Sequence, residues 1–517
     1  QIFDNRKQNL QTIQQRKEGI CVTETQTKSF SLDTRSRLTA VFGRREQTDR
    51  HRYVNHIGMH ASDIAGGWAI ARHGEESAYR GIRHGLQIHL VKDRGLCLVE
   101  KQGSVNDRDF REKGMTVSGI LGVECDEHGK KGPDGKRALD CEFTLIGKKL
   151  GLLREVPEAS TSERGEYGFT IRDKTDQRRA KHFVVADRRL RDLFLFIAND
   201  DLNGSLPMNL AKIVKASYRL LPTQKPTIQW MFYFLDAVSA TEPISKEDRG
   251  NAYQNACSYL LTALNALLKE KGFHSQVIAY ITSWIGKGEK NPRLGDEHIY
   301  DLADATALML KAVSVGAITE EGAEKWAYWG LRIMLEAQHH FHAISPGEAG
   351  KAHVEKISLR YRFGTSNYIE LRSVVFIQSD DPFIFSYLRL EKLGYDPALI
   401  IKRGSSGDIQ IHPGMFPALS SLPPGDEKKE YYRESLRDIT RDIVVALRQE
   451  ECRVRKIDMP SRDVLEQDEW DGDGSVWFRH GTAGWVMSKS LSGPETPTTK
   501  LPWESIRETI LTALKHS

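Results

Sequence analysis

The middle of the chain carries the clearest hydrophobic pattern. Between residues 187 and 345, apolar residues recur every three to four positions, as in NLAKIVKASYRLL and EEGAEKWAYWGLRIMLEAQHHFH. This period predicts a succession of amphipathic helices. From about residue 350 the pattern changes to alternation in KISLRYRF, YIELRSVVFIQS, ALIIKRG and GDIQIHPG, which predicts strands. The helical period returns in EYYRESLRDITRDIVVALRQEECRV and in WESIRETILTALKH.

The first 190 residues mix both periods. We expect a compact Gly- and Ala-rich helix over 63–72, an alternating strand over 86–91, and a helix with a glycine stop over 140–152. The apolar run MTVSGILGVEC at 115–125 predicts a buried strand, because it is rich in β-branched residues and is followed by the turn-like DEHGKKGPDGKR. Residues 155–180 are polar and are expected to form a loop.

These patterns predict an α/β protein in several parts. We expect a peripheral extension with a helix or a strand over 1–50, an α/β lobe over 51–215, a helical linker region over 216–348, and an α+β lobe over 349–517. The length of 517 residues agrees with such a division, since domains contain roughly 150 residues each.

Composition narrows the class of protein. Lys and Arg number 74 against 70 Asp and Glu, which gives a net charge of +4, and 39% of residues are hydrophobic. These values exclude a disordered chain, a collagen, a membrane channel and a wholly basic nucleic-acid binder, although a local basic groove stays open. The six cysteines form no CxxC pair, and no window approaches about 18 uncharged apolar residues. With no secretion-like N-terminus, we expect a cytoplasmic protein that does not enter a membrane.

Three short segments combine residues that can hold a metal ion. They are NHIGMHASD at 55–63, CDEHG at 125–129 and ANDDLNG at 198–204, with His56, His60, Asp63, Asp126, His128, Asp200 and Asp201 as candidates. The first segment lies at a strand-to-helix transition, and the second follows the predicted buried strand, where open α/β sheets bind ligands. Mixed imidazole and carboxylate donors suit Mn²⁺ or Mg²⁺. Taken singly, each segment also has a structural explanation, as surface histidines, a turn and a helix end.

Together these segments resemble the DHH phosphoesterase superfamily, in the branch related to the melanocyte-proliferating-gene exonucleases. HIGMHASDI at 56–64 is similar to the first family motif, which has the form H-x-G-x-x-H-x-D-[DE]. GVECDEHG at 122–129 occupies the place of the Asp-His-His motif after a hydrophobic strand, and FIANDDLNG supplies an Asp before a helical linker. The C-terminal text at 396–414 and 477–506 is similar to the family's substrate-binding domain. The resemblance spans residues 53–510.

The resemblance implies a site and a reaction. The implied ligands of one or two Mn²⁺ (or Mg²⁺) ions are His56, His60, Asp63, Asp126, His128 and Asp201. Asp126 and His128 would form the catalytic centre, where a metal-activated water attacks a phosphodiester of a nucleic-acid end or a small nucleotide. The implied contacts of the substrate phosphate are Arg403, Gly404, Gly407 and His412.

The sequence also departs from the family pattern, which keeps a second interpretation open. Glu127 stands where the family has a histidine, Ser62 stands where a carboxylate is usual, and the GGGH signature of the substrate domain is absent. The alternative is therefore a catalytically degenerate protein that binds a nucleotide or a protein partner, for example in a bacterial conflict system. The long helical middle leaves a homo-oligomer or a partner surface open.

Two other clusters have plain structural interpretations. RHGEES at 72–77 is similar to the RHGE of histidine phosphatases, but its context predicts a helix that ends in a glycine cap. The cluster His339, His340 and His342 is expected at a helix end, because adjacent residues on a helix point apart. Trp326 and Trp329 are expected in a helical core.

Overall fold

The computed structural model describes most of the chain, and the chain divides into two compact units. The described residues are 21–25, 50–56, 58–91, 115–118, 138–157, 167–173, 178–203, 208–245, 247–270, 273, 275–285, 301–363, 366–414, 427–467, 476–479, 484–489 and 496–516. The first unit comprises Gln1–Gln26, Val41–Val91 and Leu96–His339, and the second comprises Thr27–Ala40, Lys92–Gly95 and His340–Ser517.

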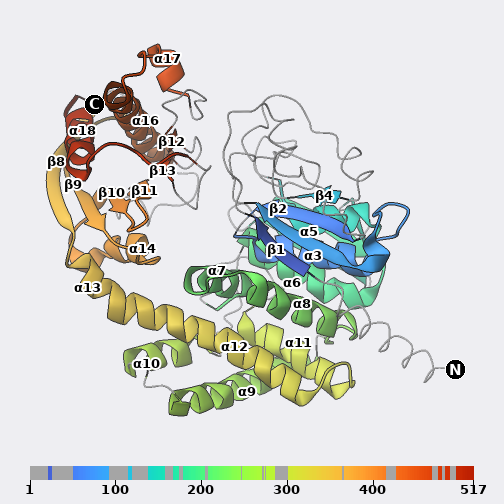
Figure 1. Ribbon diagram of the computed structural model, residues 1–517. Helices are drawn as coiled ribbons and strands as arrows, with labels where there is room; N and C mark the ends of the chain where they lie inside the picture. The colour runs from blue at the N-terminus through green and yellow to red at the C-terminus, as the bar shows by residue number, and fades with distance from the viewer. Residues whose placement is uncertain are drawn as a thin grey trace. The chain divides into compact units, whose positions relative to one another are not determined.

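A parallel four-stranded sheet organises the first unit (Figure 1). Its strands are β1 (Cys21–Thr25), β2 (His51–His56), β3 (Leu86–Val91) and β4 (Met115–Val117), in the order β1-β3-β2-β4. β2 pairs in parallel with β3 on one side and with β4 on the other. After β2 the chain continues to β3 on one side of it, and after β3 it returns to β4 on the other side. β2 therefore borders the point at which the strand order changes direction, and open α/β sheets bind ligands beside such a point. The predicted strands at 86–91 and at the start of 115–125 are confirmed.

Helix α3 (Ala61–His73) packs closely against the neighbouring strand and helix because two consecutive glycines, Gly66 and Gly67, lie at these contacts. A Cβ atom on Gly67 would lie 2.9 Å from the ring of Tyr53 in β2. A Cβ atom on Gly66 would lie 2.6 Å from Ile146 of α5 (Glu142–Lys149). The helix ends with the Gly74 N–H donating to the Ile70 carbonyl at 2.9 Å, which confirms that RHG marks a helix end.

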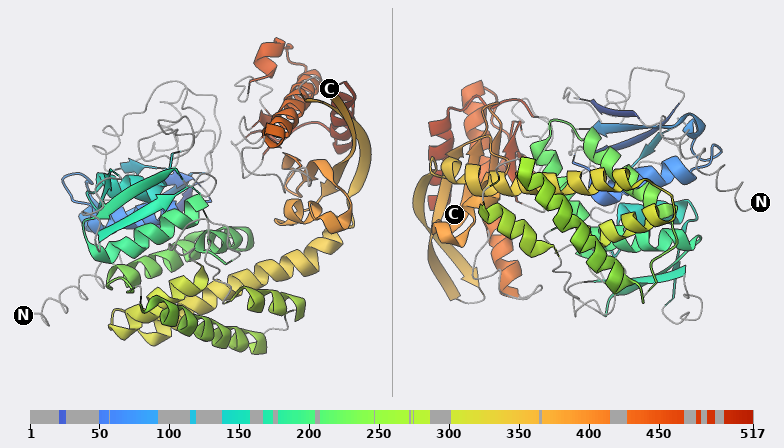
Figure 2. Two further views of the ribbon diagram at one scale, coloured as in Figure 1. Left: turned by 180° about the vertical axis from the view of Figure 1, so that it is seen from behind. Right: turned by 90° about the horizontal axis from the view of Figure 1, so that it is seen from below.

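A small antiparallel sheet follows α5, and the prediction of a loop over 155–180 was wrong at Gly168–Arg172 and at both ends of this range, where strands lie. Its strands are β5 (Leu153–Val156), β6 (Gly168–Arg172) and β7 (Ala180–Val185), in the order β5-β7-β6 (Figure 2, left). Phe169 and Phe183 are buried and stack with ring centroids 5.3 Å apart, whereas Glu155 is exposed and Arg172 and Lys181 are partly exposed. These charged side chains made the short strands look polar throughout.

The helices predicted between 187 and 345 are confirmed. After the short turns η1 (Ile82–His84) and η6 (Arg188–Leu190) come α6 (Arg191–Asn203), α7 (Leu210–Leu220), α8 (Lys225–Ser239), α9 (Arg249–Glu270), α10 (Ser275–Trp284), α11 (Leu302–Ser314) and α12 (Glu320–His339). Trp326 is 3% exposed and stacks on Trp230 with ring centroids 4.9 Å apart, so it is a core residue as expected.

The second unit contains a six-stranded mixed sheet in the order β12-β13-β11-β10-β9-β8. The strands are β8 (His353–Phe363), β9 (Ser366–Gln378), β10 (Pro397–Arg403), β11 (Ile409–Pro413), β12 (Phe478–Arg479) and β13 (Val486–Ser488). β9 and β10 run parallel, and the other neighbours are antiparallel. The strands expected from alternation after residue 350 are therefore confirmed.

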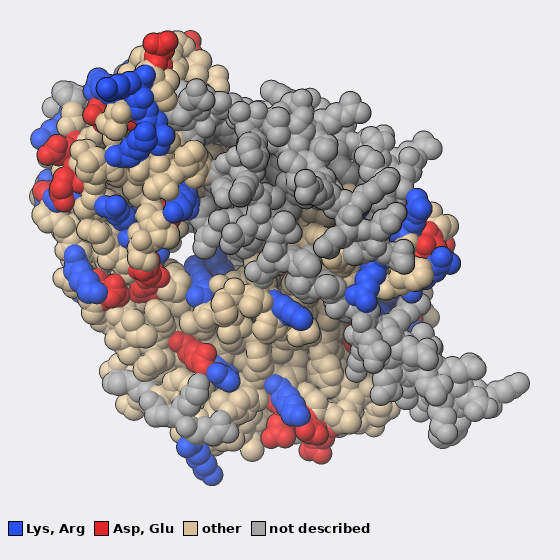
Figure 3. Space-filling view, in the orientation of Figure 1, with Lys and Arg blue, Asp and Glu red and all other residues tan. Residues whose placement is uncertain are grey.

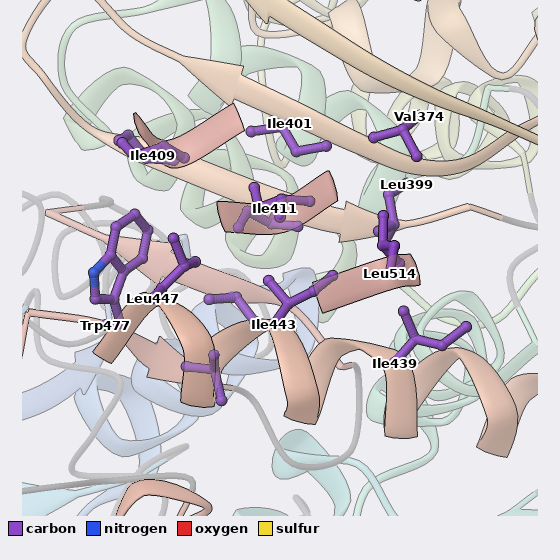
Figure 4. Packing of buried hydrophobic residues seen from close by; sticks show 14 of the residues in the cluster. Val374, Leu399, Ile401, Ile409, Ile411, Ile439, Ile443, Leu447, Trp477 and Leu514 are labelled. Atoms are coloured by element: carbon purple, nitrogen blue, oxygen red, sulfur yellow. The ribbon is translucent and has the colours of Figure 1, made fainter. Parts of the chain in front are cut away.

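Helices cover both faces of this sheet. On one face lie α16 (Glu427–Arg455) and α18 (Trp503–His516), and Figure 4 shows Ile401 and Ile411 of the sheet facing Ile443 and Leu447 of α16. On the other face lie the π-helical turn η7 (His340–Ile344), α13 (Ser345–Ala349), α14 (Ile384–Leu388) and η8 (Glu391–Leu393), while α17 (Arg462–Leu465) follows α16. The predicted α/β class is confirmed. None of the described helices is long and apolar enough to cross a membrane.

Candidate functional site

The HIGMHASD segment forms the turn that leads from β2 into α3. β2 ends at His56, and Gly58 adopts a left-handed conformation with φ of 87°, which favours glycine. The Gly58 N–H donates to Gln224 Oε1 at 3.1 Å, which ties the turn to the residue before α8. His60 is the N-cap of α3, and its N–H donates to Asp63 Oδ2 at 2.6 Å. This local geometry carries three of the predicted ligands at the carboxyl end of the central strand.

His56 and Asp63 form a buried pair at that position. His56 Nε2 lies 3.4 Å from Asp63 Oδ2, and the two side chains are 4% and 0% exposed. Burial alone would raise the pKa of Asp63, but the nearby imidazole of His56 outweighs it and holds the pKa well below the usual range. The other carboxylate oxygen, Asp63 Oδ1, is buried and has no hydrogen-bond partner among the residues described. Asp63 therefore presents an ionised, incompletely satisfied oxygen.

A second imidazole–carboxylate pair lies beside the first. His60 Nδ1 is 4.0 Å from Asp201 Oδ1, and the ring of His60 lies edge-on to that of His56 at 5.7 Å. The His60 side chain is 49% exposed, so this pair forms the open side of the cluster. The neighbouring Asp200 serves another purpose, since its Oδ2 accepts the Ala211 N–H of α7 at 2.6 Å. Burial raises the pKa of Asp200 to about 8. Asp201, as predicted, is the carboxylate near the histidines.

Three polar residues behind His56 and Asp63 were not predicted. Glu142 at the start of α5 is completely buried and accepts the Asn55 Nδ2 hydrogen at 3.2 Å, and it also contacts the Tyr53 hydroxyl. Asn55 Oδ1 in turn accepts the His56 N–H at 2.7 Å. Burial, together with the negative charges of Glu142 and Asp63, raises the pKa of Tyr53 well above its ordinary value. The indication in the sequence was Glu142 itself, a charged residue between Cys141 and Phe143 in a predicted helix.

The remaining two predicted ligands, Asp126 and His128, lie outside the described residues. The strand that precedes them, β4, is buried and parallel to β2, and the Ser118 N–H extends the pairing by donating to the Val54 carbonyl at 3.0 Å. Within the described ranges, no three His, Cys, Asp or Glu side chains form a group that could hold a metal ion. The structure thus brings four of the six predicted ligands together as two pairs.

The residues present fit a divalent cation in donor type. Imidazole and carboxylate donors suit Mn²⁺ and Mg²⁺, and Asp63 Oδ1 is a buried oxygen that lacks a donor in the described part of the chain. Ser62, at the position where the family pattern has a carboxylate, is also buried, and its hydroxyl has no partner among described residues. A hydroxyl is a weaker cation ligand than a carboxylate, so the site holds less negative charge than the family pattern implies.

Of the four predicted substrate contacts in the second unit, two line a pocket and the other two do not. Arg403 and Gly404 line a pocket of about 530 Å³ at the end of β10. Gly407, with φ of 82°, shapes the turn into β11 but does not line this pocket. His412 is sandwiched between the rings of Phe385 at 3.9 Å and Trp485 at 4.8 Å. Burial, and then nearby positive charge, lowers the pKa of His412 to about 3, so it is a neutral packing residue at neutral pH.

Comparison of the chain with protein-family models, curated proteins and solved structures finds no match. The chemistry of the site therefore has to be argued from its own residues.

Proposed function

We propose that the first unit is a metal-dependent phosphoesterase of the DHH type, which cleaves a phosphodiester of a nucleic-acid end or a small nucleotide. The observation that carries the proposal is the buried His56–Asp63 pair at the carboxyl end of β2. Ligand sites of open α/β sheets form at such a strand end, where the chain reverses across the sheet. The similarity of HIGMHASD to the first family motif adds support from the sequence.

His56, His60, Asp63 and Asp201 would hold Mn²⁺ or Mg²⁺, together with Asp126 and His128. When bound, such a cation lowers the pKa of water and neutralises charge that develops on a phosphoryl group. Asp63 is already ionised at neutral pH because His56 lowers its pKa, so it can accept a cation without first losing a proton. Asn55 orients His56 through the backbone N–H, and Glu142 fixes Asn55. These outer contacts would keep the ligands in place.

The distribution of charge is compatible with a metal-neutralised substrate. Basic and acidic side chains are interspersed over the described part of the face in Figure 3, and the net charge is only +4. A phosphodiester in such a protein would need local positive charge at the site. Bound divalent ions would supply it.

Metal-dependent hydrolysis tests the proposal directly. Purified protein is assayed with Mn²⁺ on bis(p-nitrophenyl) phosphate and on a short oligonucleotide, and bound metal is measured by mass spectrometry. We expect Asp63→Asn and His56→Ala to lower kcat/KM by at least about 100-fold and to reduce bound Mn²⁺, because each removes a ligand. Asp248→Asn and His84→Ala are matched controls, since both side chains are exposed in the same unit.

The result distinguishes the enzyme from the alternative, a degenerate binding protein. Ser62, which lacks the charge of a carboxylate, favours that second function. Nucleotide binding without turnover in any divalent metal would support it and overturn the enzymatic proposal. Unchanged hydrolysis by a folded Asp63→Asn variant would show that the site is elsewhere.

A further inference from the structure

The pocket in the second unit lies at the carboxyl ends of the two parallel strands β9 and β10, where Gln378 and Arg403 are partners in the register. Its other wall is the helical segment formed by η7 and α13. The residues that carry the argument below are His340, Glu348, Lys351, Asp380, Asp381 and Arg403. All of them belong to the second unit, so the pocket is complete within it.

Arg403 is the positively charged residue of this pocket that is available to a ligand. Its guanidinium makes no hydrogen bond or ion pair with any described residue, although the carboxylate of Asp380 lines the same pocket. The carboxylate of Asp380 is bonded to the backbone, because its Oδ1 accepts the Ser405 N–H at 2.8 Å. The guanidinium and this carboxylate therefore line the same pocket without pairing with each other.

Asp381 adds a buried carboxylate to the same wall. Its side chain is 1% exposed, and its Oδ1 accepts the Phe383 N–H at 2.8 Å and lies 3.1 Å from His340 Nε2. Its Oδ2 has no hydrogen-bond partner in the described part of the chain, and a buried carboxylate oxygen without a donor is costly. His340 opens the π-helical turn η7, a kind of irregularity that is frequent at functional sites.

The other two charges are already paired with each other. Glu348 accepts hydrogen bonds from Ser379 Oγ at 2.8 Å and from Lys351 Nζ at 2.6 Å. Among the described residues that line it, the pocket therefore offers one guanidinium without a partner, that of Arg403, and an acidic side formed by Asp380 and Asp381. A ligand with negative charge alone would meet this acidic side unfavourably, whereas a ligand with charges of both signs would satisfy both sides.

We propose that this pocket binds a small zwitterion of the α-amino-acid type, either a free amino acid or a short peptide. The carboxylate would pair with Arg403, and the ammonium would lie beside Asp380 and Asp381. Ile344, which is 44% exposed, and Pro382 provide apolar surface for a side chain of the ligand. A volume of about 530 Å³ leaves room for more than the backbone of one amino acid. This site goes beyond the proposed phosphoesterase and does not depend on it.

Calorimetric titration of the full chain, without metal, tests the proposal with defined probes. L-leucine and L-alanyl-L-leucine represent the free amino acid and the peptide, while L-leucinamide lacks the carboxylate and N-acetyl-L-leucine lacks the ammonium. We expect binding of at least one zwitterion and at least about tenfold weaker binding of both blocked forms, since each loses a charged contact. Equal binding of the blocked forms, no binding of either zwitterion, or binding of adenosine monophosphate in their place would overturn the proposal.

Variants then locate the site. Arg403→Met and Asp380→Asn should each weaken binding of the zwitterion at least about tenfold. Arg453→Met is the matched control, because this side chain is 67% exposed on α16 of the same unit and should leave binding unchanged. Unchanged affinity in a folded Arg403→Met variant would refute the assignment. If that variant does not fold, the blocked ligands still decide the question on the unmodified protein. Because no hydrolysis is measured, failure of the phosphoesterase proposal leaves this result intact.

Discussion

Asp236 fixes the helix that carries the candidate metal ligands, and its removal should loosen that helix. The carboxylate of Asp236 in α8 accepts three hydrogen bonds from α3: from Trp68 Nε1 at 2.9 Å, from Arg72 Nε at 2.7 Å and from an Arg72 terminal nitrogen at 2.7 Å. The Arg72 and Asp236 side chains are only 10% and 11% exposed. α3 is thus anchored through its C-terminal half, while His60 and Asp63 lie at its N-terminal end.

The expected cost follows from this geometry. Asp236→Ala leaves a largely buried guanidinium without its carboxylate, and breaking such a pair costs about 3–5 kcal/mol. It also leaves the indole N–H of Trp68, a residue that is 1% exposed, without its acceptor, for about 1 kcal/mol more. Asp236→Asn keeps oxygen as an acceptor but loses the charge, so its cost should be intermediate.

Urea unfolding followed by circular dichroism measures the loss, and hydrogen exchange with mass spectrometry shows whether α3 opens. Asp248→Ala serves as the control, since Asp248 is exposed and contacts only Ser245 through its side chain in the described region. A loss below about 1 kcal/mol in Asp236→Ala would refute the reasoning, because it would mean that the pair contributes no more than an exposed ion pair.

Two further predictions concern the stability of each unit. Arg448 is completely buried and donates to the carbonyls of Trp477, Leu465 and Gln467, so Arg448→Met should cost at least about 3 kcal/mol in denaturant unfolding, against about 0.5 kcal/mol or less for Arg453→Met. Equal losses would contradict this. Burial lowers the pKa of His51 to about 4, below its ordinary value of 6.5. The unfolded state therefore binds the proton first. The contribution of His51 to the free energy of unfolding is fully present above about pH 6.5. As the pH falls to about 4, this contribution decreases by about 3 kcal/mol in total. A His51→Gln variant should lose less stability over this interval, and an identical pH profile would show that His51 does not titrate this way.

The elements that bury a single face could be predicted from the sequence, because their apolar residues recur with the period of a helix or a strand. The helices α7 and α12 bury one side, so their apolar residues recur at the expected spacing, whereas β10 is buried on both faces, so its apolar residues form a short run. HIGMHASD was also interpretable locally, because the strand end, the Gly58 turn and the His60 cap follow one another within nine residues of chain.

Contacts between distant segments could not be predicted in this way. Tyr53, Asn55 and Glu142 meet only because α5 packs on α3 and β2, and nothing in their local sequence announces the pairing. His412 stands in a segment that resembles a phosphate-binding turn, but Phe385 and Trp485 come from other elements and enclose its ring. The Asp381–His340 contact likewise joins a strand end to a helical irregularity.

The strand order of the two sheets has a consequence for how each unit acquires its structure. In the second unit β8, β9, β10 and β11 are neighbours in the same order as in the chain, so the sheet can grow outward from the β8–β9 hairpin through contacts of short sequence separation. In the four-stranded sheet of the first unit every strand pair is parallel, and β4 joins β2 from about 60 residues away, after β3 has taken the other side. Loop closure over such separations slows folding. We therefore expect the strand end that carries His56 to be completed late, once its two neighbours have crossed over, and the sheet that carries Arg403 to be assembled early.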